Sequence, residues 1–144
     1  MPKTSSEAAT RLNLHGPTMG TRWSATIDAP PGLDRAALQR DLAAAVQRVD
    51  AQMSPWKRES DLARLNQAAP DHWVSLPPEM LAVLARALQI ARLSAGAFDP
   101  TVGALVDAWG FGAAREQPDP AAIEAARGAA AAAGHTQLEL DEAA

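Results

Sequence analysis

One glycine-rich run near the middle of the chain, SAGAFDPTVGALVDAWGFG at residues 94–112, constrains the fold more than any other segment. Gly96 stands where the end of a helix favours a positive φ. Asp99 followed by Pro100 is the pattern of an N-cap and the first residue of a new helix, which the closing WGFG would end. The run therefore predicts a helix, a tight turn and a second helix, and a helix start is a natural place for an anionic ligand.

The flanking segments alternate between helical and strand patterns. We expect strands at residues 11–15 and 22–28 around a turn at 16–20, a helix capped by Asp34 and ended by Ser54, a short helix capped by Ser60, a strand at 72–76, a helix opened by Pro78, a helix from Asp119 to Gly134, and a strand at 137–140. The sequence has neither a strict βαβ rhythm nor an internal repeat. This order predicts an α+β fold of mixed helices and short, largely antiparallel strands.

The composition excludes several classes of protein. The 144 residues carry a formal net charge of −4, which disfavours a nucleic-acid surface. Cysteine is absent, which excludes disulfides, thiolate metal sites and a lipid-acylated cysteine. The hydrophobic content of 47% includes many alanines, which bury little apolar area each, so we do not expect the chain to build a sufficient core by itself.

Motifs of other chemistries are weak in this sequence. His15, His72 and His135 lack the spacing of a helical metal site, so no zinc site is predicted. The GFGAAR segment at residue 110 lacks the third glycine of a dinucleotide fingerprint, and no P-loop is present. Composition leaves a Ser-His-Asp triad open, although no GxSxG elbow supports one.

Three places in the sequence offer side chains to a planar ligand. Met19 lies in a turn, where a methionine either contacts a ligand or fills a gap. Trp56 follows a proline between two helices and is either a lid over a ligand or a plug for the helix pair. The segment from Ala97 to Asp99 either brings its amides and the Phe98 ring to a nucleotide or is a plain cap between helices. The residues alone leave these alternatives open.

Four motifs in the same order resemble the ApbE family, the FAD-dependent protein flavinyltransferases. They are GPTMGTRW at 16–23, MSPWKRESDLARLN at 53–66, the helix leading into Ser94, and the GAFDPTVGALVDAWGFG turn at 96–112, in which Ala104 replaces the usual proline. The resemblance implies FAD contacts from Met19, Trp56, Ala97, Phe98 and Asp99, with Trp56 standing where the family usually has tyrosine. Within the matched segments, Ser60 and Asn66 are explained as helix caps, and Trp109 and Phe111 as packing residues.

The resemblance also implies a reaction. It indicates an FAD:protein FMN transferase, which moves FMN from FAD to a threonine of a target flavoprotein with the help of Mg²⁺ and releases AMP. The family's metal ligands lie in its C-terminal half, so neither a catalytic residue nor a metal ligand is assigned in this chain. Residues 1–144 are expected to be the N-terminal portion of a single ApbE-like flavin transferase domain, incomplete and inactive in isolation.

The same resemblance implies a location and leaves alternative functions open. Family members are commonly exported and lipid-anchored, which implies the periplasm or the outer face of the cytoplasmic membrane, although we identify neither a signal segment nor an anchor in these residues. One alternative is a non-catalytic FAD-binding or flavoprotein-maturation module. A second is an FAD pyrophosphatase, because water can replace threonine as the acceptor. An uncommitted α+β interaction domain is the remaining possibility.

Overall fold

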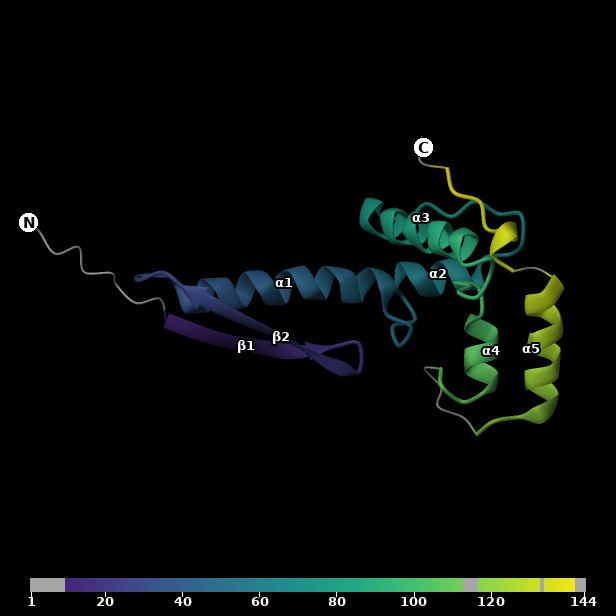
Figure 1. Ribbon diagram of the computed structural model, residues 1–144, viewed down its shortest axis with the longest axis horizontal. Helices are drawn as coiled ribbons and strands as arrows, with labels where there is room; N and C mark the ends of the chain where they lie inside the picture. Colours follow the sequence, from purple (N-terminus) through teal and green to yellow (C-terminus); the bar gives the residue numbers. More distant parts are fainter. Residues whose placement is uncertain (1–9, 113–116, 133, 142–144) are drawn as a thin grey trace, which may run out of the picture. The chain divides into compact units, whose positions relative to one another are not determined.

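The computed structural model describes residues 10–112, 117–132 and 134–141, and the chain divides into two compact units (Figure 1). The first unit spans Met1–Asn66 and holds β1 (Thr10–Thr18), β2 (Thr21–Ala29) and α1 (Arg35–Met53), and α2 (Asp61–Gln67) begins near its end. The second unit spans Gln67–Ala144 and holds α3 (Pro78–Leu93), α4 (Gly103–Ala108), α5 (Pro120–Ala132) and the 3₁₀ turn η1 (His135–Gln137). Helices mixed with an antiparallel strand pair confirm the predicted α+β class.

The two strands form a hairpin whose turn is shorter than predicted. They pair antiparallel in a continuous register that ends at Thr18 and Thr21, so Met19 and Gly20 alone make the turn. Both turn residues have positive φ, 41° and 70°, as a type I′ hairpin turn requires. The predicted turn at 16–20 is wrong in extent because Gly16 continues β1. A Cβ on Gly16 would lie 2.6 Å from the indole nitrogen of its cross-strand partner Trp23, so glycine leaves room for that ring.

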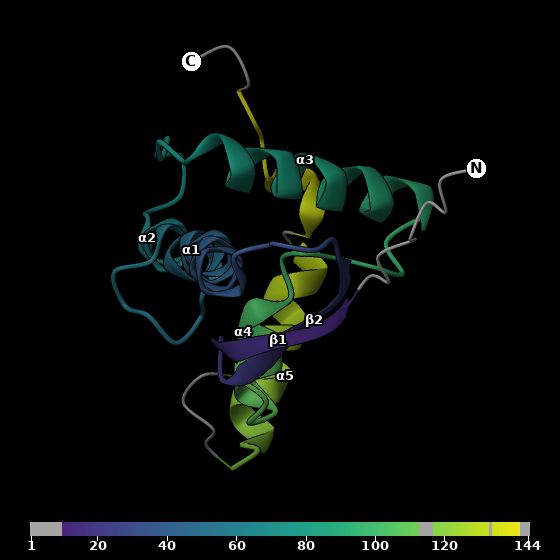
Figure 2. The same ribbon diagram turned by 90° about the vertical axis from the view of Figure 1, so that its left-hand side faces the viewer.

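Helix α1 packs along β1 (Figures 1 and 2). It begins as predicted because the Asp34 carboxylate accepts hydrogen bonds from the amides of Ala36 and Ala37, at 2.8 and 3.0 Å. The side-chain amide of Gln39 donates to the His15 carbonyl of β1 at 3.0 Å. Leu38, Leu42, Val46 and Met53 of the predicted apolar stripe are half-buried, but Val49 is 43% exposed, and no α1 residue is fully buried. The first unit therefore has a thin core.

Helix α3 provides most of the buried apolar side chains of the second unit. It opens at Pro78, as predicted, and buries Met80, Leu88 and Ala91. Helices α4 and α5 lie side by side in both views (Figures 1 and 2). The predicted cap of α5 is also present, since the Asp119 carboxylate accepts from the Ala121 amide at 2.9 Å. Among the described residues, none of the helices is long and apolar enough to cross a membrane.

Two predicted strands are absent from the described part of the chain. Residues 72–76 form no regular element, and the segment predicted as a strand at 137–140 begins instead as the end of η1. The alternation that suggested the second strand is real, since Leu138 and Leu140 are half-buried and Glu139 between them is exposed. A strand also needs a partner for its backbone groups, and neither segment pairs with β1 or β2. The local pattern was correct, but the pairing that it implied was wrong.

Candidate functional site

The GAFD turn is held by hydrogen bonds from its amides to the end of α3 and to Ser94. Gly96 has the predicted positive φ, 82°, and its amide donates to the Ala91 carbonyl at 2.9 Å to end α3. The Ala97 amide donates to the Ser94 carbonyl and the Phe98 amide to the Ser94 hydroxyl, both at 3.1 Å. These two amides are therefore engaged in the turn. The Phe98 ring, with the residue 44% exposed, is the largest surface that the turn offers to a ligand.

The Asp99 carboxylate closes the next turn and does not open a helix. One of its oxygens accepts from the Thr101 amide at 2.8 Å and from the Thr101 hydroxyl at 2.6 Å, and the other accepts from the His135 amide at 3.2 Å. The prediction that Asp99 and Pro100 start a helix is wrong, because α4 begins only at Gly103. Asp99 thus links the GAFD turn to a segment 36 residues further along the chain.

Acid should loosen this turn. Hydrogen bonds from the Thr101 hydroxyl and then the Thr101 amide lower the pKa of Asp99 below its usual 3.8, with smaller contributions from His135, whereas desolvation opposes them. Because the pKa is lower in the folded chain, the ionised carboxylate stabilises the fold above pH 3.8 and this contribution is lost as the pH falls through the folded-state pKa. Between about pH 6 and pH 2.5, the Tm measured by thermal unfolding should fall less in Asp99→Asn than in the unchanged chain.

The matched control for this titration is Asp71→Asn, which removes an exposed carboxylate from the same unit. That variant should keep the acid sensitivity of the unchanged chain. If Tm falls equally with acid in Asp99→Asn and in the unchanged chain, the ionisation of Asp99 does not contribute to the acid sensitivity of the fold.

Of the two aromatic residues after α4, Phe111 does not pack as predicted. Trp109 is 43% exposed and Phe111 is 81% exposed. The backbone holds this turn, since the Gly110 amide donates to the Asp107 carbonyl at 2.8 Å and the Phe111 amide to the Val106 carbonyl at 3.1 Å. A Cβ at Gly112 would overlap the Asp107 carboxylate, so the close approach of the backbone needs glycine. The turn is therefore held by its backbone, and the exposed Phe111 ring does not anchor it by packing.

The structure brings Met19 and Trp56 to the same place in the first unit. Trp56 lies in the loop between α1 and α2, is 47% exposed, and its indole lies 3.7 Å from where a Cβ on Gly20 would stand. The ring therefore rests against the hairpin turn that contains Met19. Of the two roles left open by the sequence, a plug buried between helices does not fit a half-exposed ring. Ala97, Phe98 and Asp99 lie together in the second unit.

Two buried serines support the Trp56 loop. The Ser60 hydroxyl donates to the Ser54 carbonyl at 2.8 Å and accepts from the Ala63 amide at 3.1 Å, which confirms its predicted role as the cap of α2. The Trp56 amide donates to the Ser54 hydroxyl at 3.3 Å. The predicted C-cap at Asn66 is wrong, because α2 continues through it to Gln67. The buried Ser54 and Ser60 thus fix the backbone of the loop between α1 and α2, while the indole of Trp56 stays partly exposed.

Asp50, in the last turn of α1, belongs to none of the candidate sites suggested by the sequence. Its carboxylate lies 2.5 Å from the Lys57 ammonium. The hydrogen bond from Lys57 lowers the pKa of Asp50 most, desolvation opposes it, and Ser54 and finally the Met19 amide add smaller lowering contributions. The only sequence signal was the spacing of Asp50, Ser54 and Lys57 across a helix end, which on its own resembles an ordinary solvated helix face.

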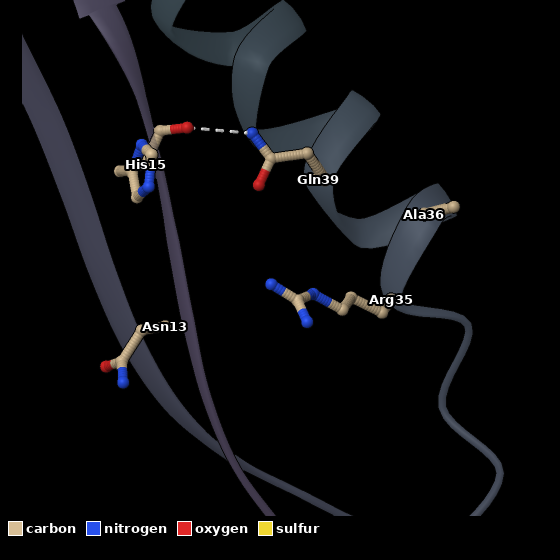
Figure 3. Close-up of a pocket in the computed structure, with 5 residues that line it drawn as sticks. All are labelled: Asn13, His15, Arg35, Ala36 and Gln39. Atoms are coloured by element: carbon tan, nitrogen blue, oxygen red, sulfur yellow. Dashed lines mark hydrogen bonds between the residues drawn. The ribbon is translucent and has the colours of Figure 1, made fainter.

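A cavity of about 490 Å³ lies elsewhere in the first unit, beside β1 and the start of α1 (Figure 3). The side chain of Arg35 points from α1 toward the strands. The cavity includes none of the residues predicted to bind FAD; its lining consists of Asn13, His15, Arg35, Ala36 and Gln39. Its position gives no support to a flavin site there.

The described residues do not fit a magnesium site. Over residues 10–112, 117–132 and 134–141, no group of three or more histidine, aspartate or glutamate side chains is arranged to hold a metal ion. Asp50, at the end of α1, is paired with Lys57, and Asp99, in the GAFD turn, accepts hydrogen bonds from Thr101 and the His135 amide. No metal ligand is therefore assigned.

Comparison with known proteins identifies one family. A family model described as the ApbE family matches residues 19–144. An FAD:protein FMN transferase of Vibrio cholerae is 36% identical over 105 residues, which cover 72% of this chain and 31% of that protein. A protein of the same name from Klebsiella pneumoniae is 35% identical over 125 residues, covering 85% and 36% respectively. The chain thus spans about a third of the length of these relatives.

Solved structures give the same result. The flavin transferase ApbE of Vibrio cholerae superposes with a TM-score of 0.76 at 33% identity, over 83% of this chain and 40% of that one. The apo flavinyl transferase ApbE of Pseudomonas stutzeri superposes with a TM-score of 0.80 at 26% identity, over 94% of this chain and 46% of that one. The α+β arrangement of the described elements is therefore shared with these proteins.

Proposed function

The chain belongs to the ApbE family, and we propose that it carries FAD-binding parts of an FAD:protein FMN transferase. One observation of the structure supports this most directly. Trp56, which is 47% exposed, lies against the hairpin turn formed by Met19 and Gly20, so a partly exposed aromatic face stands at that turn. Such a surface suits a flavin or adenine ring. In the second unit, the exposed Phe98 ring of the GAFD turn is the corresponding apolar contact.

The proposed reaction transfers FMN to a threonine hydroxyl of a target flavoprotein. The pyrophosphate bond of FAD breaks, a phosphoester bond forms to the threonine oxygen, AMP leaves, and the hydroxyl proton passes to a base or to water. Pyrophosphate cleavage of this kind commonly uses Mg²⁺ held by carboxylates. The described residues do not fit such a site, so the proposed role of this chain is to bind and orient FAD, and no catalytic step is assigned to its side chains.

An FAD titration tests the binding role. Flavin fluorescence should be quenched when FAD is titrated with the purified 144-residue chain, and the quenching should saturate. Absence of quenching at high protein concentration would refute FAD binding by these residues.

We further propose that the 144 residues alone do not transfer FMN, since they span about a third of the relatives' length. The chain would be mixed with FAD, Mg²⁺ and a threonine-bearing acceptor flavoprotein, and intact-mass analysis should find no covalent FMN. A mass increase of one FMN would overturn this part of the proposal. Release of free FMN and AMP would instead favour hydrolysis of FAD.

We also propose, from family membership, that the reaction takes place in the periplasm or at the outer face of the cytoplasmic membrane. Fractionation of cells that produce the protein from its native gene tests this directly. Recovery of the protein in the cytoplasmic fraction alone would rule that location out.

A further inference from the structure

Asp50 lies where the hairpin turn, the end of α1 and the Trp56 loop meet. Its carboxylate binds the ammonium of Lys57, the residue after Trp56, at 2.5 Å. Weaker hydrogen bonds from Ser54 and from the Met19 backbone also lower the pKa of Asp50. The Trp56 amide in turn donates to the Ser54 hydroxyl at 3.3 Å. One carboxylate at the end of α1 therefore holds the loop residue next to Trp56, whose ring lies against Gly20 of the hairpin turn.

We propose that Asp50 fixes the Trp56 loop against the hairpin turn and so positions Trp56 for FAD. Asp50 is then a positioning residue that does not itself touch FAD. This inference rests on the proposed function for its ligand, but the geometry of the loop stands by itself. Asp50, Ser54 and Lys57 are called the Asp50 clasp below.

The exposed fractions of Asp50, Lys57 and Trp56 bear on whether the ion pair positions the Trp56 loop or stabilises the whole fold. The side chain of Lys57 is 43% exposed and that of Asp50 is 16% exposed, so solvent screens the ion pair at its lysine end, where replacement of Lys57 should cost little folding stability. Trp56 is itself 47% exposed, so it lacks the full burial that would fix a core aromatic ring in place. A weak but directed contact can therefore decide where the ring lies without deciding whether the unit folds.

A first experiment needs no FAD. In Asp50→Asn, the Trp56 amide should exchange with solvent about tenfold faster than in the unchanged chain, because the loop loses its charge-assisted contact. The matched control is Asp28→Asn, which removes a carboxylate from an exposed ion pair with Arg11 in the same unit and should leave Trp56 exchange unchanged. Unchanged exchange at Trp56 in Asp50→Asn overturns the proposal.

A second experiment asks whether Asp50 acts through Trp56. Asp50→Asn should weaken FAD binding by about tenfold in the unchanged chain and by less than about twofold when Trp56 is already alanine. Equal effects in both backgrounds would mean that Asp50 acts independently of the ring, which overturns the proposal. If the unchanged chain does not bind FAD, the proposed function fails, and the exchange experiment alone decides the positioning role.

Lys57→Gln provides a second variant in case Asp50→Asn unfolds. It removes the more exposed member of the Asp50 clasp, so the fold should survive while Trp56 exchange accelerates in the same direction. Lys57→Arg keeps the positive charge and should restore slow exchange. Fast exchange in both Lys57 variants would contradict a charge-dependent clasp.

Discussion

Replacement of Trp56 by alanine is expected to weaken FAD binding by about 5- to 150-fold, because stacking of a base on an aromatic side chain contributes about 1–3 kcal/mol. The indole is 47% exposed and supported by the hairpin turn, so it is available to a ring without first leaving a core. The effect should appear in the dissociation constant from flavin fluorescence quenching. Trp56→Phe should keep most of the affinity, since it keeps a flat aromatic face.

Trp73 provides the matched control. It is also a tryptophan outside the regular elements, is 70% exposed, and belongs to none of the matched motifs. Trp73→Ala should bind FAD with the affinity of the unchanged chain. If the two alanine variants lose equal affinity, or if Trp56→Ala loses none, Trp56 is not a flavin contact.

Replacement of Met80 by alanine is expected to destabilise the second unit by about 2–5 kcal/mol, the usual cost of removing a large buried side chain and leaving a cavity. Met80 is 2% exposed and belongs to a small set of buried apolar residues. Because a whole domain has only about 5–15 kcal/mol of stability, this loss should remove much of the folded population. Urea unfolding followed by circular dichroism would show a lower midpoint for the part of the signal that comes from this unit.

Val83 on the same helix is the control for Met80. It is 53% exposed, so Val83→Ala removes little buried area and should change the free energy of unfolding by less than about 0.5 kcal/mol. A comparable loss in both variants would mean that α3 is sensitive along its whole length and that Met80 has no special place in the core.

The features that the sequence predicted best depend on atoms close together in the chain. Asp34, Ser60 and Asp119 cap helices as expected, because each accepts from an amide two or three residues later. Pro78 opens α3 and Gly96 has its positive φ for equally local reasons. The hairpin, too, needed only two neighbouring alternating segments and a turn.

The features that the sequence did not predict depend on distant contacts. Asp99 has the local pattern of a helix N-cap, but its carboxylate binds Thr101 and the His135 amide, and no local rule specifies the latter. Asp50 resembled any acid on a helix face until the fold brought it to Lys57 and the hairpin turn. The FAD contacts proposed for Met19, Trp56, Ala97, Phe98 and Asp99 stay predictions, although the structure shows which of their groups are exposed.

Met19 occupies a backbone conformation that suits asparagine or aspartate better than methionine. With φ of 41° beside Gly20 at 70°, the hairpin turn has the geometry for which Asn-Gly is the preferred pair. Selection for thermal stability alone would therefore favour asparagine here and delete the thioether, whereas selection for flavin affinity would keep methionine despite the strain. In a library randomised at this one codon, the most heat-resistant clones and the tightest flavin binders should be different sequences.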